Sequence, residues 1–479
     1  MALMSTGALG DTICAIATPA GEGGIGIVRL SGSRALAVAG QLVRLRSGRP
    51  LSSMVSHTLH LADIRLPPSV VSPHVHAYRL PLPGGEVFDE ALVVFMKAPR
   101  SFTGEDTVEI QSHGGGLVLS LICRACIAAG ARMAAPGEFT KRAFLNGRID
   151  LSQAEAVLDT IRAKSAAGLT AAQRQLRGEL ARQVDAAREA LLRLLAELEA
   201  GIDFVGEDIE LVDRQELAGT VDNVTLRVQR LAATAQNGRR LREGARVVIL
   251  GRPNVGKSSL LNRLLKDDRA IVTPIPGTTR DIIEESVELE GVIIHLVDTA
   301  GIRETDDVLE REGIRRSRSA QSNADLQIVV IDGTVPLSDD DRVLLDYAAT
   351  GKCVTVINKA DLPIRVDPSD VKPGPPVVSL SAKTGEGIDL LRAAIRDQLI
   401  EAGADTADGV IVTNLRHQAA LDRAKQSLNH ARQSVEGGMA NELVALDIRA
   451  AADALGEITG AITTDEILER IFSTFCIGK

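Results

Sequence analysis

The segment Gly251-Arg-Pro-Asn-Val-Gly-Lys-Ser258 combines two glycines with a lysine and a serine at the spacing G-x-x-x-x-G-K-S. The glycines allow backbone N–H groups to approach phosphate oxygens, Lys257 supplies a positive charge to the β- and γ-phosphates, and the Ser258 hydroxyl can bind Mg²⁺. The segment follows the apolar run 246–250 and opens a helical pattern, which is the context that such a loop requires. The chain is therefore predicted to bind a nucleoside triphosphate.

Two further motifs can complete a magnesium and phosphate site. Asp298-Thr-Ala-Gly301 directly follows an apolar run, so its carboxylate stands at the C-terminal end of a predicted strand, where it can orient the water ligands of Mg²⁺. Gly301 can then lie near the γ-phosphate. Thr279, in Gly277-Thr-Thr-Arg-Asp281, lies between the two phosphate motifs, where a switch threonine is expected. Ser258 and Thr279 are the predicted magnesium ligands.

Two motifs after later strands predict guanine as the base. In Asn358-Lys-Ala-Asp361, the Asp361 carboxylate can accept from N1–H and N2–H of guanine, donors that adenine lacks, and Asn358 can bond the base edge and brace the loop. In Ser381-Ala-Lys383, the Ala382 N–H can meet guanine O6. A site built for these bonds rejects adenine, because its own polar groups would be left unpaired. The predicted activity is GTP binding and hydrolysis.

The predicted GTP contacts come from these motifs and from the segment between them. They are Asn254, Val255, Gly256, Lys257, Ser258, Ser259, Thr273, Pro274, Ile275, Pro276, Gly277, Thr278, Thr279, Asp298, Thr299, Ala300, Gly301, Asn358, Lys359, Asp361, Ser381, Ala382 and Lys383. The residue after Gly301 is Ile302, where many GTPases place a glutamine that orients the attacking water. Isoleucine cannot hydrogen-bond to water, so another group must take this role.

The elements that hold these motifs alternate between strands and helices. The predicted strands are 246–250, 292–297, 326–331, 354–357 and 377–380. This alternation predicts a mainly parallel sheet with helices on both faces. No proline lies between residues 137 and 252 or after residue 376, so long helices can form at 150–200 and 415–475.

The first of these helical regions carries an apolar stripe with spacings of three and four. Its members are Leu176, Leu180, Val184, Ala187, Leu191, Leu194 and Leu198. Residues 1–120 are predicted to form strands and turns, including 25–30 and 90–96. The expected architecture is an α/β P-loop GTPase domain inserted into an α-helical domain, preceded by a separate β-rich domain.

Three shorter patterns in the N-terminal region are weaker signals. Gly21-Glu-Gly-Gly-Ile-Gly26 fits the dinucleotide fingerprint, but an apolar strand follows it and no helix N-terminus is available for a pyrophosphate. His113-Gly-Gly-Gly116 resembles the oxyanion motif of lipases, yet the chain has no G-x-S-x-G. Cys123 and Cys126 lie in an apolar helical stretch, where a buried structural role is favoured over redox chemistry or zinc binding.

Composition limits the class of protein. A length of 479 residues indicates roughly three domains. A net charge of -9, no tryptophan and two tyrosines argue against extensive nucleic-acid binding and leave few stacking platforms. The chain shows no signal peptide and no run of 18 apolar residues, so no membrane span is expected. Five scattered cysteines suit a reducing environment, and the predicted location is the cytoplasm.

The whole chain resembles the MnmE (TrmE) family of tRNA modification GTPases. Besides the nucleotide motifs, the resemblance rests on Ala17-Thr-Pro19, Gly23-Gly-Ile-Gly-Ile-Val-Arg29, Ser101-Phe-Thr-Gly-Glu-Asp106, Pro136-Gly-Glu-Phe139, Arg142-Ala-Phe-Leu-Asn146 and the terminal Cys476-Ile-Gly-Lys479. It implies an N-terminal α+β folate-binding and dimerisation domain at 1–145, similar to that of tetrahydrofolate-dependent aminomethyltransferases. The helical domain would comprise 146–242 and 404–479, with the GTPase domain at 243–403.

The resemblance implies a potassium ion in place of an arginine finger. Its ligands would be the Asn254 side chain and oxygens of Thr273, Ile275 and Thr278, and the cation would offset negative charge that develops on the phosphates. Glu310 would orient the attacking water through a second water. The GTPase domains would dimerise across the nucleotide, with switch regions at about 270–281 and 299–316.

The resemblance also places a folate site in the N-terminal domain. Arg29, Glu109, Arg148 and Lys479 would bind a tetrahydrofolate derivative, either 5-formyl or 5,10-methylene. Arg148 stands where the family commonly has lysine, and the two cations differ in geometry. Cys476 is a candidate catalytic nucleophile, with a buried anchor of the tail as the alternative.

These implications define the predicted function and its rival. The protein would act as a homodimer with a flavin-dependent partner of the MnmG (GidA) type, in a heterotetramer whose FAD sits on the partner. Together they would modify carbon 5 of the wobble uridine, U34, of certain tRNAs. The alternative is a regulatory GTPase switch in ribosome assembly or signalling. Such a switch would need neither the folate residues nor the terminal Cys476-Ile-Gly-Lys479.

Overall fold

A computed structural model of the chain divides into two compact units, Met1–Glu155 with Ile462–Lys479, and Ala156–Ala461. This partition differs from the four-part domain division expected from the sequence, which stays a prediction. The structure describes residues 10–66, 86–203, 213–267, 284–289, 291–298, 324–348, 351–366, 371, 374–399 and 410–479.

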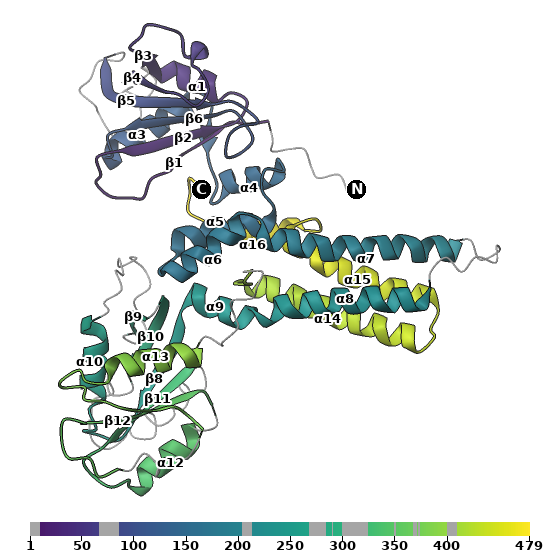
Figure 1. Cartoon of the computed structure of the whole chain (residues 1–479). Helices are drawn as coiled ribbons and strands as arrows, with labels where there is room; N and C mark the ends of the chain where they lie inside the picture. The colour runs from purple at the N-terminus through teal and green to yellow at the C-terminus, as the bar shows by residue number, and fades with distance from the viewer. Residues whose placement is uncertain are drawn as a thin grey trace, which may run out of the picture. The chain divides into compact units, whose positions relative to one another are not determined.

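The first unit contains a seven-stranded sheet in the order β3-β4-β5-β6-β2-β1-β7 (Figure 1). Neighbouring strands are antiparallel except for the parallel pair β1 and β7. The strands are β1 (Ile13–Ile16), β2 (Gly26–Ser31), β3 (Val43–Leu45), β4 (Leu59–Arg65), β5 (Val87–Met96), β6 (Thr107–Ser112) and β7 (Arg132–Met133). Helices α1 (Ala35–Leu42) and α3 (Gly116–Ala128) pack on the sheet and share its apolar core. The short 3₁₀ helix η1 (Leu51–Ser53) follows β3.

Helix α1 corrects the expectation that residues 1–120 form only strands and turns. Ala35, Val38, Ala39 and Leu42 are all fully buried, and their spacing of three and four gives one apolar stripe over two turns of helix. Eight residues are too short for the pattern to stand out from its strand-rich surroundings.

Other expectations for this unit are confirmed. Strand β2 follows the glycine-rich segment, as expected when the dinucleotide fingerprint was excluded. Cys123 and Cys126 are buried on α3, and Cys14 of β1 lies 3.8 Å from Cys123, sulfur to sulfur. Contact with Cys123 and burial raise the pKa of the Cys14 thiol well above its usual range. These thiols therefore serve as small apolar core side chains.

The rest of this unit contains α4 (Glu138–Leu145), the beginning of α5 (Leu151–Arg162), whose larger part belongs to the second unit, and α16 (Asp465–Phe472). Helix α4 contacts α16, so segments more than 300 residues apart in sequence lie together. Gly137 precedes α4 at φ 64°, and a Cβ there would lie 2.7 Å from the Phe472 carbonyl oxygen. Only glycine allows this close approach.

The second unit contains a six-stranded sheet in the order β13-β12-β11-β8-β10-β9. The strands are β8 (Ala245–Leu250), β9 (Glu284–Leu289), β10 (Val292–Asp298), β11 (Leu326–Asp332), β12 (Cys353–Asn358) and β13 (Val377–Ser379). All neighbours are parallel except β9 and β10. The five predicted strands are confirmed, with each end within one residue of the prediction, whereas the antiparallel β9 was not predicted.

Alternate residues of β8 explain why the sheet needs helices on both faces. Val247 and Ile249 pack with α10 (Lys257–Asp267) and α13 (Ile388–Leu399), while Val248 and Leu250 pack toward α12 (Asp339–Ala348). A strand that is apolar on both sides is typical of a parallel sheet covered on both faces. The predicted α/β fold class is confirmed.

A bundle of long helices forms the other part of this unit. Its helices are α6 (Ala166–Leu176), α7 (Glu179–Asp203), α8 (Arg214–Ala233), α9 (Ala235–Glu243), α14 (Leu415–Glu436) and α15 (Asn441–Thr459). From Leu180 to Leu198, the predicted stripe is buried on α7 against α8 and α15, in an apolar core that α14 shares. Leu176 instead ends α6 and is half-buried, because the helical region 150–200 is broken into three helices.

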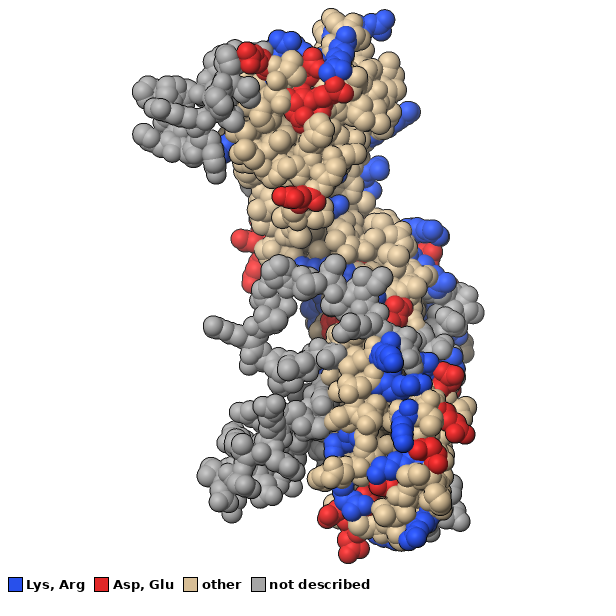
Figure 2. Space-filling model, turned by 90° about the vertical axis from the view of Figure 1, so that its left-hand side faces the viewer, with Lys and Arg blue, Asp and Glu red and all other residues tan. Residues whose placement is uncertain are grey.

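The hydropathy of the described helices and the distribution of charge on the surface are as the composition predicts. Within the part of the chain that the structure describes, no helix has both the length and the apolar character needed to span a membrane. On the face drawn in Figure 2, basic and acidic side chains are interspersed instead of forming one continuous basic surface.

Candidate functional site

The phosphate loop connects β8 to α10, and both of its glycines are required by packing. Gly251 has φ 151°, and a Cβ there would lie 2.4 Å from the Val330 carbonyl oxygen. Gly256 has φ 100°, and a Cβ there would lie 2.2 Å from Asn358 Nδ2. Lys257 Nζ donates to the Gly251 carbonyl at 2.7 Å, which places its charge against the loop predicted to hold phosphates.

Asn358, at the end of β12, joins three of the predicted motifs. Its Nδ2 donates to the Val255 carbonyl of the phosphate loop at 2.8 Å, and its Oδ1 accepts from the Ala382 N–H at 3.0 Å. The sequence predicted this Ala382 N–H as a donor to guanine O6, whereas in the structure it donates to Asn358. The side chain is buried, so both bonds are shielded from water. Asn358 therefore braces the loop, which is one of its two predicted roles.

The remaining base-recognition residues are also held by hydrogen bonds. Ser381 Oγ donates to Asp361 Oδ1 at 2.7 Å, which orients the exposed carboxylate predicted to bind guanine. Lys359 has φ 69°, and its Nζ donates to Asp332 Oδ2 at 2.5 Å. Burial alone would raise the pKa of Asp332, but the hydrogen bonds from Lys359 and Thr334 and the charge of Lys359 together outweigh it, so this pKa is lowered. The structure thus brings together Asn358, Asp361, Ser381 and the phosphate loop.

Other predicted GTP contacts are placed only in part. Asn254 is exposed at φ 65°, and Ser258 and Ser259 are exposed in the first turn of α10. The backbone of Asp298 ends β10, beside Ile249 at the end of β8. Outside the described residues lie Thr273, Pro274, Ile275, Pro276, Gly277, Thr278, Thr279, Thr299, Ala300, Gly301 and Glu310.

In the first unit, Arg29 and Glu109 form the centre of a second candidate site. They are direct cross-strand partners on β2 and β6, and Arg29 Nε lies 2.7 Å from Glu109 Oε1. The Arg29 guanidinium lies 5.7 Å from the centre of the Phe139 ring and donates to the Gly478 carbonyl at 3.4 Å. The C-terminal tail is therefore brought to this ion pair.

Two glycine contacts seat the tail. Gly478 has φ 96°, and a Cβ there would lie 2.3 Å from the Ile16 carbonyl oxygen at the end of β1. The Gly137 N–H donates to the Cys476 carbonyl at 3.4 Å. Burial and the neighbouring positive charge of Arg29 lower the pKa of Lys479. Sequence reasoning had no signal for Gly137 as a partner of the tail, because the two segments meet only in the folded unit.

The predicted folate residues are thus partly assembled. Arg29 and Glu109 are paired, and the tail brings Lys479 to them, because Arg29 donates to the carbonyl of the preceding Gly478. Arg148 is exposed after α4, and among the described residues no hydrogen bond or ion pair joins it to Arg29 or Glu109. Cys476 is exposed, so the alternative of a buried anchor is wrong.

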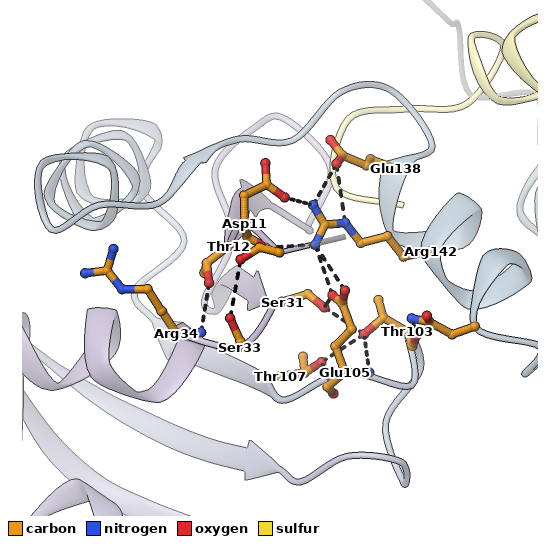
Figure 3. A network of polar contacts seen from close by, with 12 residues as sticks. Asp11, Thr12, Ser31, Ser33, Arg34, Thr103, Glu105, Thr107, Glu138 and Arg142 are labelled. Carbon is orange, nitrogen blue, oxygen red and sulfur yellow. Dashed lines mark hydrogen bonds and ion pairs between the residues drawn. The ribbon is translucent and has the colours of Figure 1, made fainter. Parts of the chain in front are cut away.

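A network of charged side chains centred on Arg142 of α4 is shown in Figure 3. Arg142 is 3% exposed and pairs with Asp11, Glu105 and Glu138 at 2.6, 3.1 and 3.0 Å. Burial would raise the pKa values of Asp11 and Glu138, but bonds from arginines outweigh it and lower both values. Arg132 adds two bonds to the Glu138 carboxylate. The network was not predicted.

A second unpredicted contact lies at the phosphate loop, where Arg252 forms an ion pair with Asp341. The spacing Ser338-x-x-Asp341 before a helix is a recognisable capping signal and could have drawn attention to Asp341. Nothing in the sequence indicates that Arg252 is its partner. Together the described contacts form a phosphate-binding loop with a guanine-type recognition edge, and a separate basic and acidic site at the C-terminal tail.

Comparisons with known proteins identify the family of the chain. The family sequence model described as "MnmE helical domain" matches residues 151–476, and that described as "GTP-binding protein TrmE N-terminus" matches residues 12–148. The solved G domain of the T. maritima FeoB iron transporter is 28% identical, and the match covers 33% of this chain and 99% of the FeoB domain. Its TM-score of 0.26 is too low to support a conclusion.

Full-length relatives give the decisive comparison. A "tRNA modification GTPase MnmE" from Symbiobacterium thermophilum is 48% identical, with 98% of this chain and 99% of the relative covered. The protein of the same description from Chloroflexus aurantiacus is 50% identical, with 98% and 100% covered. The extent of these matches shows that the chain belongs to the MnmE family of tRNA modification GTPases.

Proposed function

We propose that the protein is a potassium-activated GTPase that modifies the wobble uridine U34 of certain tRNAs at carbon 5. With a flavin-dependent partner of the MnmG type, it installs an aminomethyl or carboxymethylaminomethyl group whose one-carbon unit comes from folate. The observation that carries this proposal is the seating of the C-terminal tail against the Arg29–Glu109 pair. A GTPase that acted only as a switch would not need this second site.

The tail site fits a tetrahydrofolate derivative by its donor set. Glu109 offers acceptors for the N–H groups at the edge of a pterin ring, and Arg29 and Lys479 offer positive charge. Folate bound there would supply the one-carbon unit. Arg148 is proposed as a further folate ligand and the exposed Cys476 as a nucleophile. FAD is assigned to the partner, because hydride chemistry needs a cofactor-binding fold of its own.

The phosphate loop fits the proposed metal ions. Asn254 presents its amide from an exposed, left-handed position, which suits an oxygen ligand for K⁺ together with Thr273, Ile275 and Thr278. The Ser258 hydroxyl lies in the first turn of α10 and would bind Mg²⁺ together with Thr279. Such cations would stabilise the charge that develops on the phosphates. Glu310 is proposed to orient the attacking water through a second water.

The N-terminal sheet supports the proposed homodimer. Helices α1 and α3 share a core with one face of the sheet, while Leu59, Leu61 and Leu92 are exposed on strands β4 and β5. Leu61 and Leu92 are direct cross-strand partners, so they form one apolar patch. Large exposed apolar side chains in one place favour a protein contact. The proposed assembly is a homodimer that joins its partner in a cytoplasmic heterotetramer.

The decisive experiment is mass spectrometry of tRNA nucleosides from cells that lack this gene and carry a plasmid copy. The wild-type copy should restore a carbon-5 aminomethyl-type uridine, and a copy truncated before Cys476 should not. The truncated protein should still hydrolyse GTP. An unchanged nucleoside profile without the gene would favour the regulatory switch, and normal modification by the truncated copy would remove the tail from the reaction.

Potassium activation needs a test of its own. GTP hydrolysis by the purified protein should be much faster in KCl than in NaCl at equal ionic strength. Asn254→Ala should abolish this difference while GDP still binds, because the side chain is assigned to the cation. Equal rates of the wild-type protein in both salts would disprove potassium activation and leave the tRNA proposal untouched.

A further inference from the structure

The second residue of the phosphate loop is tied to helix α12 by a two-point ion pair. Arg252 Nε lies 2.8 Å from Asp341 Oδ1, and Arg252 Nη2 lies 2.8 Å from Asp341 Oδ2. The Asp341 side chain is 1% exposed. A guanidinium that meets a carboxylate through two parallel bonds fixes the orientation of both groups, which a single bond does not.

The Asp341 carboxylate is also held by hydrogen bonds from Ser338, at the start of its own helix. Asp341 Oδ2 accepts from the Ser338 N–H at 3.0 Å and from the Ser338 hydroxyl at 2.8 Å. In return, Ser338 Oγ accepts from the Asp341 N–H at 3.3 Å. This reciprocal arrangement is a capping box at the start of α12. Arg252 is therefore anchored to a rigid helix end.

The loop is held at both ends, and Asn254 lies between them. At one end Arg252 is bound by Asp341, and at the other end the Val255 carbonyl is bound by Asn358 Nδ2 at 2.8 Å. Asn254 itself has φ 65°, a region that residues other than glycine seldom adopt. Asparagine tolerates this conformation better than other residues that carry a side chain, and the contacts at the two ends of the loop limit how far it can change.

We propose that Arg252 and Asp341 are positioning residues that hold the phosphate loop in its nucleotide-binding conformation. The pair orients the loop N–H groups toward the diphosphate and keeps Asn254 in its left-handed conformation. Neither side chain is required to touch the nucleotide. The proposal concerns GDP binding, and only its potassium arm depends on the function proposed above.

The first experiment measures the dissociation of a fluorescent GDP analogue from the full-length protein. Asp341→Asn should weaken GDP binding by about tenfold or more, mostly through faster release, because it breaks a buried charge pair. Arg252→Lys keeps the positive charge but loses the two-point contact with the carboxylate, so it should weaken GDP binding less than Asp341→Asn does. The matched control is Asp340→Asn, an exposed carboxylate in the same turn, which should change affinity by less than about twofold. Equal affinities of the Asp341 and Asp340 variants would overturn the proposal.

A second variant separates positioning from a loss of stability. Arg252→Met combined with Asp341→Asn leaves no unpaired buried charge and keeps an acceptor for Ser338, so its thermal unfolding should approach that of the wild type. GDP binding should remain about tenfold weaker in this double variant than in the wild type, because the two bonds between the side chains at 252 and 341 are absent. Recovery of wild-type GDP affinity together with stability would show that the pair is only structural.

The part of the proposal that concerns potassium is tested by measuring the concentration of KCl that gives half-maximal GTP hydrolysis. This concentration should rise several-fold in Arg252→Lys, because Asn254 is less firmly held, whereas Asp340→Asn should match the wild type. An unchanged value in Arg252→Lys would remove Asn254 from the proposal. A wild-type enzyme without potassium activation would contradict the cation assignment instead, and the GDP measurements would still decide the role of the pair.

Discussion

Asn358 Nδ2 donates to the carbonyl oxygen of Val255 at 2.8 Å, so the base-recognition motif and the phosphate loop are joined by one buried side chain. The same side chain accepts from the Ala382 N–H, which adds the third motif. Because the bonds are buried, loss of the side chain leaves polar groups without partners. The three motifs of the nucleotide site are therefore linked through the Asn358 side chain.

Asn358→Ala should consequently reduce both stability and nucleotide affinity. The free energy of unfolding should fall by about 1–3 kcal/mol, because the Val255 carbonyl and the Ala382 N–H lose their buried partner. Thermal unfolding without nucleotide measures the first effect, and GDP dissociation measures the second. Unchanged unfolding would mean that other groups satisfy these backbone atoms.

Asp361→Asn should change base specificity. An amide still accepts from N1–H, but it presents a donor where guanine N2–H₂ needs an acceptor. GDP affinity should fall by about 10- to 100-fold, since hydrogen bonds to charged groups are worth about 1.5–3 kcal/mol. Xanthosine diphosphate, with an oxygen at carbon 2, should bind better to the variant than to the wild type. A variant that keeps its preference for GDP would remove Asp361 from base recognition.

Gly478→Ala should separate tRNA modification from GTP hydrolysis. The added Cβ would lie 2.3 Å from the Ile16 carbonyl oxygen, and φ 96° is strained for alanine, so the tail should leave its seat. Modification in a complementation assay should be lost while the GTPase rate stays near that of the wild type. Ile477→Ala, at an exposed neighbouring position, is the control and should modify tRNA normally. Normal modification by the Gly478 variant would contradict the proposed role of the seat.

Glu138→Gln should weaken the N-terminal unit in a pH-dependent way. The folded pKa of Glu138 lies below its usual value near 4.5, so its ionised form stabilises the fold above that pH. This contribution is lost as the pH falls through the lower folded pKa. At neutral pH the variant should lose about 1–3 kcal/mol of unfolding free energy, and the loss should shrink in acid.

Chemical denaturation of the wild type and of Glu138→Gln between pH 7 and pH 3 measures how the difference in their unfolding free energies changes with pH. Glu90→Gln serves as control, since its ion pair with Arg46 is about half exposed and solvent screening should leave the stability of this variant close to that of the wild type. A deficit of the Glu138 variant that is constant with pH would show that packing, and not ionisation, is what the substitution changes.

The sequence was sufficient to predict a helix or strand wherever a short local pattern determines that element. The strand before Gly251 and the strand before Asn358 were predictable, because a run of apolar residues followed by a fixed motif specifies a strand end. Helix α1 was not predicted, because eight residues give too short a periodic signal. The partition of 150–200 into three helices also escaped prediction, since no proline marks the breaks.

By itself, the sequence determined the nucleotide class, the α/β class of the central fold and the family, because these depend on residue types at short, fixed spacings. Only the tertiary structure decided that Arg252 meets Asp341, that Arg142 gathers three carboxylates, and that Gly478 sits beside the end of β1. Apart from the Arg142–Glu138 pair, which is four positions apart on one helix, these contacts join residues that are 37 to about 460 positions apart. Such distances are set by packing of whole elements, which no local pattern encodes.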